Sequence, residues 1–292
     1  MDMDLSAPSL DDVASLSHDE AAAIVRDARA AMEPEPALLE IDGALMLAGD
    51  IHGDFYTARA AVRRFIDRGY DHLVFLGDYV DRAPADVGSS VPAVTYLLDV
   101  KREMPRHVHL LKGNHESHHL LPVAPYTFDR EVEDRYPGLY PLYVDAFREM
   151  PLMLLGSNVF AAHGGILKDH DVETLGRLGK NDPGVVEALT WSDPTAAQTM
   201  RGAGDPYSEE ELHDFLDDVD ARLFVKGHDY STLGMAIYGG RCLTLFTSRR
   251  YRTSGNNGVL VAEVDGMVET VDDVRVKNYV DGQWRDYEVA VK

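Results

Sequence analysis

The 292-residue chain contains a single cysteine, Cys242, and lacks any uninterrupted apolar run of the roughly 18 residues that suggest a membrane span. One thiol cannot form an intrachain disulfide, and the strand expected at 242–246 would hold it as a small buried hydrophobe. The N-terminus, Met1-Asp2-Met3-Asp4, lacks the charged-then-apolar order of a signal peptide. These absences predict a cytoplasmic protein with no membrane partner.

Positive charge is also scarce. Lysine and arginine together number 28 against 50 acidic residues, which gives a net charge of −22, and only seven of the basic residues are lysines. Such a surface repels nucleic acid, so we expect no nucleic-acid partner. The acidic side chains on such a surface also repel one another unless salt screens their charges. The composition therefore favours an acidic, halophile-type protein of a salt-rich cytosol; the alternative is an ordinary acidic protein.

Five short apolar runs share one feature, because each ends in an Asp, Asn or His that mostly lies beside a glycine. The runs are 45–48, 72–76, 108–111, 159–162 and 223–225. Runs of this length are typical of buried strands, and a neighbouring glycine lets backbone approach closely. Ligands in such sheets gather outside the carboxyl ends of the strands. We therefore expect one shared site.

The candidate metal ligands at these strand ends are three oxygen donors and three imidazoles: Asp50, His52, Asp78, Asn114, His163 and His228. Six ligands are too many for one catalytic ion, which normally keeps a coordination position open. They suit two divalent ions about 3.5–4 Å apart that share a carboxylate and act on a phosphate group. Mn²⁺ is our first expectation, and Fe, Zn and Co tolerate the same ligands.

The motifs around these residues resemble the signatures of the calcineurin-like metallophosphoesterases, and more narrowly those of the phosphoprotein phosphatase family of Ser/Thr phosphatases. The matching stretches read Gly49-Asp50-Ile51-His52-Gly53, Gly77-Asp78-Tyr79-Val80-Asp81-Arg82, Gly113-Asn114-His115-Glu116, His163-Gly164-Gly165 and Trp191-Ser192-Asp193-Pro194. A late stretch from Thr244 to Ser248, with Tyr251, is similar to the family's strand and loop beside the site. The likeness runs from about residue 20 to 265.

The resemblance implies a role for each matched position. It implies that Asp50, His52 and Asp78 hold a first metal, that Asn114, His163 and His228 complete a second, and that Asp78 bridges them. It implies that His115 is the general acid and that Asp81 orients it in its protonated form. The implied phosphate-binding residues are Arg82, Arg201, Asn114 and Tyr251.

Three positions depart from the family pattern. The family usually has Arg where Lys112 stands, and Ala-His-Gln or similar at 227–229, where this chain has Gly-His-Asp. Its Ser-Ala-Pro-Asn-Tyr loop is replaced by a stretch containing Arg249 and Arg250. Two arginines beside the pocket could favour a more anionic substrate; the alternative is that they are solvated surface charges.

The resemblance implies a Ser/Thr protein phosphatase acting on phosphoproteins or phosphopeptides, and nothing in the sequence names a regulatory subunit. A dinucleoside tetraphosphatase or another small-molecule phosphoesterase shares the front motifs, and Trp191-Ser192-Asp193-Pro194 argues against it. A non-catalytic scaffold with this fold would be expected to lack some ligands, and all six are present.

The expected fold class is α/β: the resemblance implies a sandwich of two mixed β-sheets flanked by helices, with the dimetal site at the strand C-termini. We expect a flexible acidic N-terminus over 1–16 and a single catalytic domain over 17–292. Helices are predicted at 18–30, 56–67, 91–103 and 205–220, with Pro-broken helices over 117–150. Hairpins are predicted to pair 38–41 with 45–48, 259–264 with 267–271, and 274–280 with 284–289.

Overall fold

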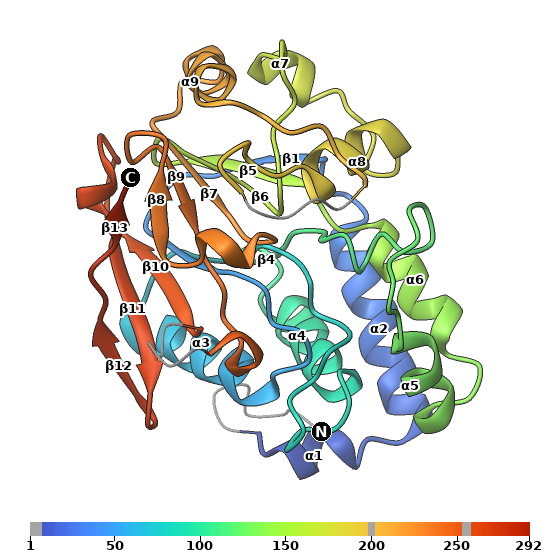
Figure 1. Cartoon of the computed structure of the whole chain (residues 1–292). Helices are drawn as coiled ribbons and strands as arrows, with labels where there is room; N and C mark the ends of the chain where they lie inside the picture. Colours follow the sequence, from blue (N-terminus) through green and yellow to red (C-terminus); the bar gives the residue numbers. More distant parts are fainter. Residues whose placement is uncertain (1–7, 198–201, 253–257) are drawn as a thin grey trace.

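The computed structural model describes residues 8–197, 202–252 and 258–292, and two β-sheets stacked between two layers of helices make up its architecture (Figure 1). The six-stranded sheet has the order β12-β11-β10-β2-β3-β4, and the seven-stranded sheet the order β1-β5-β6-β7-β9-β8-β13. The expected sandwich of two mixed sheets flanked by helices is confirmed.

Three parallel strands form half of the six-stranded sheet: β2 (Leu45–Ala48), β3 (His72–Phe75) and β4 (Val108–Leu110). Parallel neighbours require crossover connections, which α3 (Phe55–Arg68) and α4 (Val91–Glu103) supply. The antiparallel half contains β10 (Leu260–Val264), β11 (Arg275–Val280) and β12 (Gln283–Asp286). Because β2 and β3 point the same way, the residues that follow them emerge at one edge of the sheet.

The seven-stranded sheet contributes two more site strands, β6 (Val159–Ala162) and β7 (Leu223–Lys226), which also pair in parallel. Its other strands are β1 (Leu38–Glu40), β5 (Met153–Gly156), β8 (Met235–Ile237), β9 (Cys242–Thr244) and β13 (Ala290–Val291). Cys242 is fully buried in β9, as expected. An isolated bridge between Asp50 and Phe246 links the segments that leave β2 and β9.

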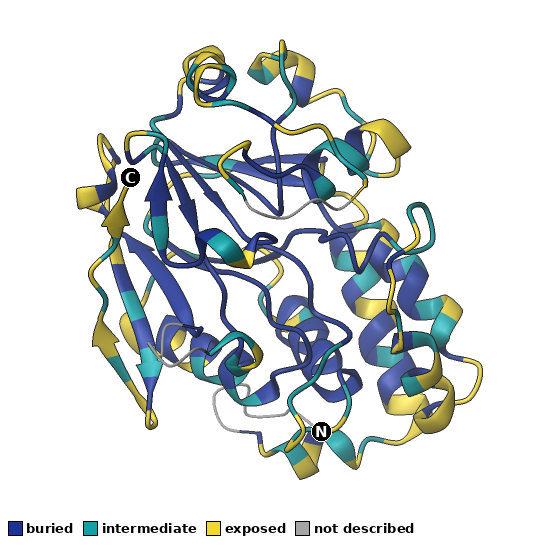
Figure 2. Ribbon diagram, in the orientation of Figure 1, coloured by how far each residue is buried: buried dark blue, intermediate teal, exposed yellow. Residues whose placement is uncertain are grey.

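The central strands of both sheets are buried (Figure 2). Their alternating side chains belong to separate cores. In β2, Leu45 and Leu47 face the core between the two sheets, whereas Met46 and Ala48 face the helices. In β6, Val159 and Ala161 likewise face the other sheet. Strands that are buried on both faces read as continuous apolar runs, which is why they were recognisable in the sequence.

The helices cover the outer faces of the sheets. On the six-stranded side these include α2 (His18–Met32), α5 (Phe128–Arg135) and α6 (Tyr140–Arg148); the seven-stranded side carries α7 (Val172–Leu175), α8 (Pro183–Trp191) and α9 (Glu209–Asp218). The 3₁₀ turns are η1 (Tyr230–Thr232), η2 (Arg249–Tyr251) and η3 (Val271–Asp273). The predicted capping box of Ser17 and Glu20 is present at the start of α2.

The predicted hairpin between 38–41 and 45–48 is wrong. β1 pairs in parallel with β5 in one sheet, while β2 pairs with β3 and β10 in the other. β2 is buried along its whole length and lies inside its sheet, whereas β1, with an exposed Glu40, forms an edge of the other sheet.

The predicted strand at 267–271 is also wrong. The carboxylate of Asp273 accepts hydrogen bonds from the backbone N–H groups of Glu269 and Thr270, and the chain turns into η3. Such side-chain capture of backbone amides competes with strand pairing. β10 pairs with β11 instead, and the β11–β12 hairpin follows the prediction closely.

Part of the N-terminal segment that was predicted to be flexible is helical. Residues 1–7 lie outside the described part of the chain, but α1 (Leu10–Ala14) forms within the segment predicted to be loose, with a capping box from Ser9 and a buried Val13. Within 8–197, 202–252 and 258–292, no helix combines the length and apolar character needed to cross a membrane.

Candidate metal centre

The ends of five strands bring the six predicted ligands into one buried cluster. Asp50 and His52 follow β2, Asp78 follows β3, and Asn114 follows β4. The seven-stranded sheet adds His163 after β6 and His228 after β7. No member of the cluster is more than 4% exposed.

Asp78 lies between two imidazoles. Its Oδ2 is 3.4 Å from Nε2 of His52, and its Oδ1 is 3.4 Å from Nε2 of His163. Two groups of side chains with ligand atoms within 4.8 Å of one another therefore share this carboxylate: His52, Asp78 and His115, and Asp78, His163 and His228. Because its two oxygens face different imidazoles, Asp78 would be placed to be shared between two ions.

Backbone carbonyls fix the orientation of both imidazoles. Nδ1 of His52 lies 2.9 Å from the carbonyl oxygen of Val80, and Nδ1 of His163 lies 2.9 Å from that of Leu76. When each Nδ1–H donates to its carbonyl, the Nε2 lone pair faces Asp78 and can bind a metal.

The other three predicted ligands, Asp50, Asn114 and His228, lie in the same cluster. Asp50 accepts a hydrogen bond at 3.0 Å from the backbone N–H of His228, and its second oxygen is 3.8 Å from Nε2 of His52. The side-chain amide of Asn114 lies 3.1 Å from Nε2 of His163, and a half-turn of that amide brings its nitrogen within 3.2 Å of Nδ1 of His228.

The electrostatics of this cluster fit a divalent cation. Burial raises the pKa of Asp50 to about 6, and the carboxylate of Asp78 contributes to the rise. Burial also lowers the pKa of His52 to about 3, so this imidazole is neutral at physiological pH. Burial acts to lower the pKa of His163, but the carboxylates of Asp78 and Asp50 together outweigh it and raise this pKa to about 9. The buried carboxylate pair therefore attracts positive charge, which a bound cation would supply. The mixed N and O donors suit Mn²⁺, Fe or Zn²⁺.

The backbone around the ligands is tightly constrained. A Cβ on Gly227 would lie 2.2 Å from Oδ1 of Asp50, so a larger residue at this position would require the Asp50 carboxylate to move. Several site residues other than glycine also have left-handed backbone conformations: His52, Asp78, Asp81, Arg82 and His228. Such conformations cost about 1–3 kcal/mol each and persist only where the surroundings impose them.

His115 is held by a second carboxylate. Its Nδ1 lies 2.5 Å from Oδ2 of Asp81, while its Nε2 has no hydrogen-bond partner among the described residues and is 3.9 Å from Oδ2 of Asp78. The other oxygen of Asp81 accepts hydrogen bonds from the backbone N–H groups of Thr127 and Phe128. Burial opposes ionisation of Asp81, but the hydrogen bond and charge of His115 and the backbone N–H groups of Thr127 and Phe128 together outweigh it and lower the pKa of Asp81.

Two of the predicted phosphate-binding residues contact each other beside the cluster. Nη1 of Arg82 donates to the hydroxyl oxygen of Tyr251 at 3.0 Å and lies 3.4 Å from Nε2 of His52. The Tyr251 ring centroid is 5.6 Å from that of His52. Arg201 lies outside the described residues, so its predicted place beside the phosphate stays a prediction.

Glu116 is a positioning residue that the sequence did not reveal. It accepts hydrogen bonds at 2.8–3.0 Å from the backbone N–H groups of Asp78, Tyr79 and Gly113, and so ties the loop after β3 to the loop after β4. Only its place in the motif, directly after His115, could have indicated such a role.

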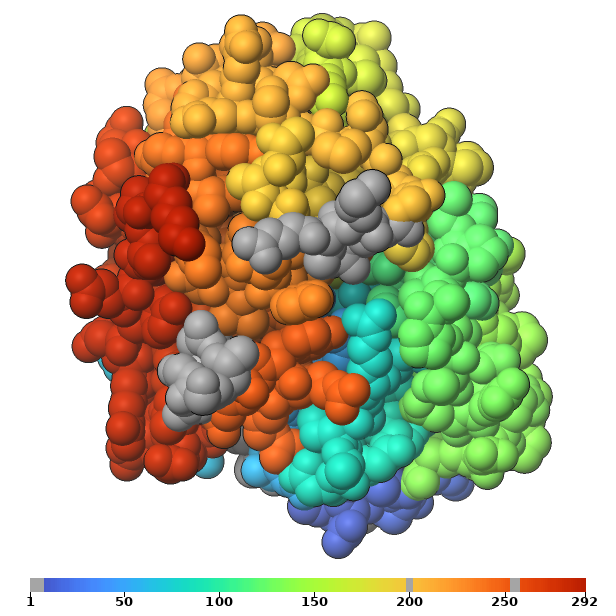
Figure 3. Space-filling model, in the orientation of Figure 1, coloured from blue at the N-terminus to red at the C-terminus, as the bar shows by residue number. Residues whose placement is uncertain are grey.

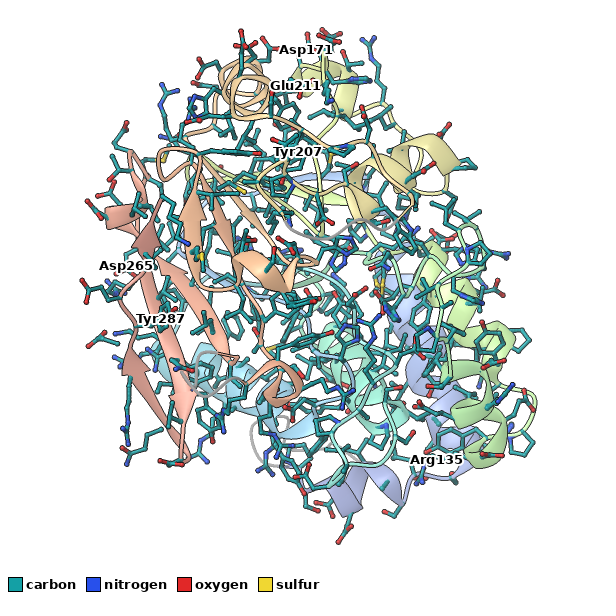
Figure 4. The ribbon with its side chains drawn as sticks, viewed as in Figure 1. Arg135, Asp171, Tyr207, Glu211, Asp265 and Tyr287 are labelled. Carbon is teal, nitrogen blue, oxygen red and sulfur yellow. The ribbon has the colours of Figure 1, made fainter. Side chains whose placement is uncertain are left out.

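The Trp-Ser-Asp-Pro stretch supports the same site from the other sheet. The Trp191 ring lies 6.1 Å from that of His228, and Oδ1 of Asp193 is 4.0 Å from Nε2 of His228. Tyr207, labelled in Figure 4, pairs with Asp193 through the backbone and donates its hydroxyl to the carbonyl oxygen of Gly164. Through these two hydrogen bonds, Tyr207 connects Asp193, which lies near His228, to Gly164, which follows His163.

Stacked mixed sheets with a buried carboxylate and imidazole cluster at their strand ends have the architecture expected of a metal-dependent hydrolase. Residues 44–231 match the family model described as calcineurin-like phosphoesterase, and the chain belongs to this family.

Named relatives agree with this assignment. The chain is 29% identical over 268 residues to a serine/threonine-protein phosphatase of Caenorhabditis elegans, a match that covers 83% of this chain and 57% of the relative. It is 30% identical over 235 residues to a "Probable serine/threonine-protein phosphatase" of Encephalitozoon cuniculi, covering 75% of this chain and 50% of the relative. The chain therefore spans about half the length of these relatives.

Among solved structures, the fold is similar to a protein serine/threonine phosphatase from Saccharomyces cerevisiae described as similar to human phosphatase PP5. The TM-score is 0.75, the sequence identity is 22%, and the match covers 91% of each chain. At this identity the likeness confirms the fold.

Proposed function

We propose that this protein is a metal-dependent phosphomonoester hydrolase that acts on phosphoserine or phosphothreonine in proteins. One observation carries the proposal: an imidazole anchored by a carboxylate, His115 on Asp81, stands beside the six predicted metal donors and the guanidinium of Arg82. Ester hydrolysis at phosphorus needs these three elements, which are a site that activates water, a phosphate clamp and an acid for the leaving oxygen.

Asp50, His52 and Asp78 would hold one ion, and Asn114, His163 and His228 would complete a second that shares Asp78. When bound, the ions supply Lewis-acid polarisation of the phosphate and lower the pKa of water. Mn²⁺ is our expectation, and Fe, Zn and Co are compatible with the same donors.

The remaining residues act on the substrate directly. Arg82 would bind nonbridging phosphate oxygens, since a guanidinium matches them in charge and geometry, and Tyr251 orients it through their hydrogen bond. His115, fixed at Nδ1 by Asp81, would donate the proton on Nε2 to the departing serine or threonine oxygen. Asn114 and Arg201 are proposed to assist phosphate binding.

A panel assay with Mn²⁺ tests the proposed substrate class. Phosphoserine and phosphothreonine peptides are expected to give kcat/KM values at least about tenfold above those for a phosphotyrosine peptide, diadenosine tetraphosphate and a cyclic nucleotide. Faster hydrolysis of diadenosine tetraphosphate than of the phosphopeptides would indicate that the protein is a small-molecule phosphoesterase instead. A metal-loaded protein inactive on every substrate would contradict the hydrolase proposal itself.

We also propose that residues 17–292 act as one catalytic domain in the cytoplasm. Strands of both sheets contribute ligands to the same cluster, which supports the single domain. The single cysteine supports the location.

The acidic composition leads to a prediction about salt. Carboxylates such as Asp171, Glu211 and Asp265 lie at the rim of the molecule (Figure 4), and the net charge is −22. Salt shortens the screening distance from about 10 Å at 0.1 M to about 3 Å at 1 M. We therefore expect the Tm, measured by calorimetry, to rise by several degrees between dilute buffer and molar KCl. A Tm that does not rise with salt would indicate an ordinary acidic protein and contradict the halophile-type interpretation.

A further inference from the structure

The sequence left open whether Arg249 favours a more anionic substrate or is a solvated surface charge; in the structure it joins three segments of the chain. It begins η2, and its guanidinium pairs with Asp54, at the start of α3, and with Asp86, in the loop that follows β3. In Figure 3 the segment that contains η2 lies directly against that loop. The guanidinium also lies 5.0 Å from the ring centroid of Tyr56.

The contact with Asp54 is buried. The Asp54 side chain is 0% exposed and accepts hydrogen bonds from the backbone N–H of Arg249 at 2.7 Å, from Nε at 3.0 Å and from Nη2 at 2.9 Å. A buried carboxylate needs such a partner, because leaving it unpaired is strongly unfavourable. The position of η2 is thereby fixed relative to the start of α3.

The contact with Asp86 reaches the loop that carries Arg82. Nη1 of Arg249 donates to Oδ2 of Asp86 at 2.8 Å, and Nη2 donates to Oδ1 at 3.2 Å. Four residues earlier in this loop, Arg82 has a φ of 58°, directly after Asp81 with a φ of 62°. Left-handed conformations at two successive residues other than glycine require outside support.

The bond between Arg82 and Tyr251 spans the same two segments. Tyr251 is in η2 with Arg249, and Arg82 is in the loop with Asp86. We propose that Arg249 is the positioning residue of the phosphate clamp: it fastens η2 to the Arg82 loop and so sets where the guanidinium of Arg82 meets the phosphate. This inference rests on the proposed function, because it assigns Arg82 to phosphate binding.

The geometry argues against direct substrate binding by Arg249. One N–H on Nε, one on Nη1 and both on Nη2 already donate to carboxylates. A guanidinium paired with two carboxylates presents little net positive charge to a further anion. Arg250, the next residue, is exposed and forms no side-chain ion pair with the described residues.

Arg249→Ala, with Arg250→Ala as the matched control, tests the proposal. Because Arg82 contacts phosphate in both the ground state and the transition state, its misplacement should appear mainly in KM. We expect Arg249→Ala to raise KM for a phosphoserine peptide about tenfold with a smaller change in kcat, whereas Arg250→Ala leaves KM within about twofold. Arg249→Lys should recover part of the loss, since it keeps a cation beside Asp54 but cannot grip two carboxylates.

If Arg249→Ala does not fold, a second variant and a second measurement still test the proposal. The Asp86 side chain is 55% exposed, so Asp86→Asn should fold; we expect it to raise KM about threefold in the parent and to add no further loss in Arg249→Lys. Hydrogen exchange of the backbone amides at 83–88 should be faster in Arg249→Ala and Asp86→Asn, and unchanged in Arg250→Ala.

Unchanged KM and exchange in the Arg249 and Asp86 variants would overturn the proposal. So would equal losses in Arg249→Ala and Arg250→Ala that grow with the negative charge of the substrate, because that pattern indicates direct contact. If the parent hydrolyses no phosphomonoester, the proposed function fails, while the exchange measurement still decides whether Arg249 holds the Arg82 loop.

Discussion

Replacing Asp78 with asparagine is expected to remove both ions from the protein and to lower kcat/KM by about 10³-fold or more. The two oxygens of Asp78 face different histidines, His52 and His163, each at 3.4 Å, so one carboxylate serves both halves of the centre. Charge stabilisation by bound ions is worth several kcal/mol, and each 1.36 kcal/mol corresponds to a tenfold change in rate.

Elemental analysis of the parent and the Asp78→Asn variant after dialysis measures this effect. The parent should contain two ions per chain and the variant close to none. Asp99→Asn is the matched control, because Asp99 is equally buried but lies in α4, where it pairs with Arg102. It should retain both ions. One ion per chain in the parent, or full occupancy in Asp78→Asn, would contradict the shared carboxylate.

The residues at the strand ends could be predicted because the pattern that marks them lies within a few neighbouring residues of the sequence. A strand buried on both faces is a continuous apolar run, and the polar residue that follows it marks where the strand leaves the core. Asp50, Asp78, His163 and His228 each follow such a run, and Gly227, beside His228, allows a close approach to Asp50. Convergence followed from the parallel order of the strands, which the strand–helix–strand pattern indicated.

Strand pairing was less predictable because it depends on partners far along the chain. β1 and β2 are separated by a turn-like Asp42-Gly43, which favours a hairpin locally. β1 pairs with β5, more than 100 residues later, and β2 pairs with β10, more than 200 residues later. Local turn chemistry cannot outweigh the burial that both sheets offer to an apolar strand.

The contacts of Arg249 in the site could not be predicted for the same reason, because they join residues far apart in the sequence. Its partner Asp54 is 195 residues away, and a single sequence gives no sign that the two meet. The sequence could place an arginine beside the pocket but not say whether its charge was already paired. The left-handed backbone conformations of His52, Asp78 and His228 could not be predicted either, because glycine is the residue whose presence indicates that conformation in a sequence.

His115 provides the most selective prediction. Replacing it with asparagine is expected to keep both ions and to lower kcat/KM for phosphoserine by about 10²–10⁴-fold. Serine leaves as a basic alkoxide that needs a proton, whereas p-nitrophenolate is far less basic and leaves without one. Hydrolysis of p-nitrophenyl phosphate should therefore fall much less. Asp81→Asn should show the same selectivity more weakly, because Asp81 acts through His115 at 2.5 Å.

The competing role for His115 is metal binding, since its ring nitrogen lies within 4.8 Å of the ligand atoms of His52 and Asp78. The ratio of the two substrate rates, together with the metal content, separates the two roles. A ligand contributes to both reactions, so its loss would remove an ion and slow both substrates equally. An acid contributes only where the leaving group needs a proton, so its loss would change the ratio and leave the ions in place. Nδ1 of His115 is held by the carboxylate of Asp81, whereas the Nδ1 atoms of His52 and His163 are held by neutral backbone carbonyls. A negatively charged partner suits an imidazole that carries a proton to the leaving group, so we expect the second result.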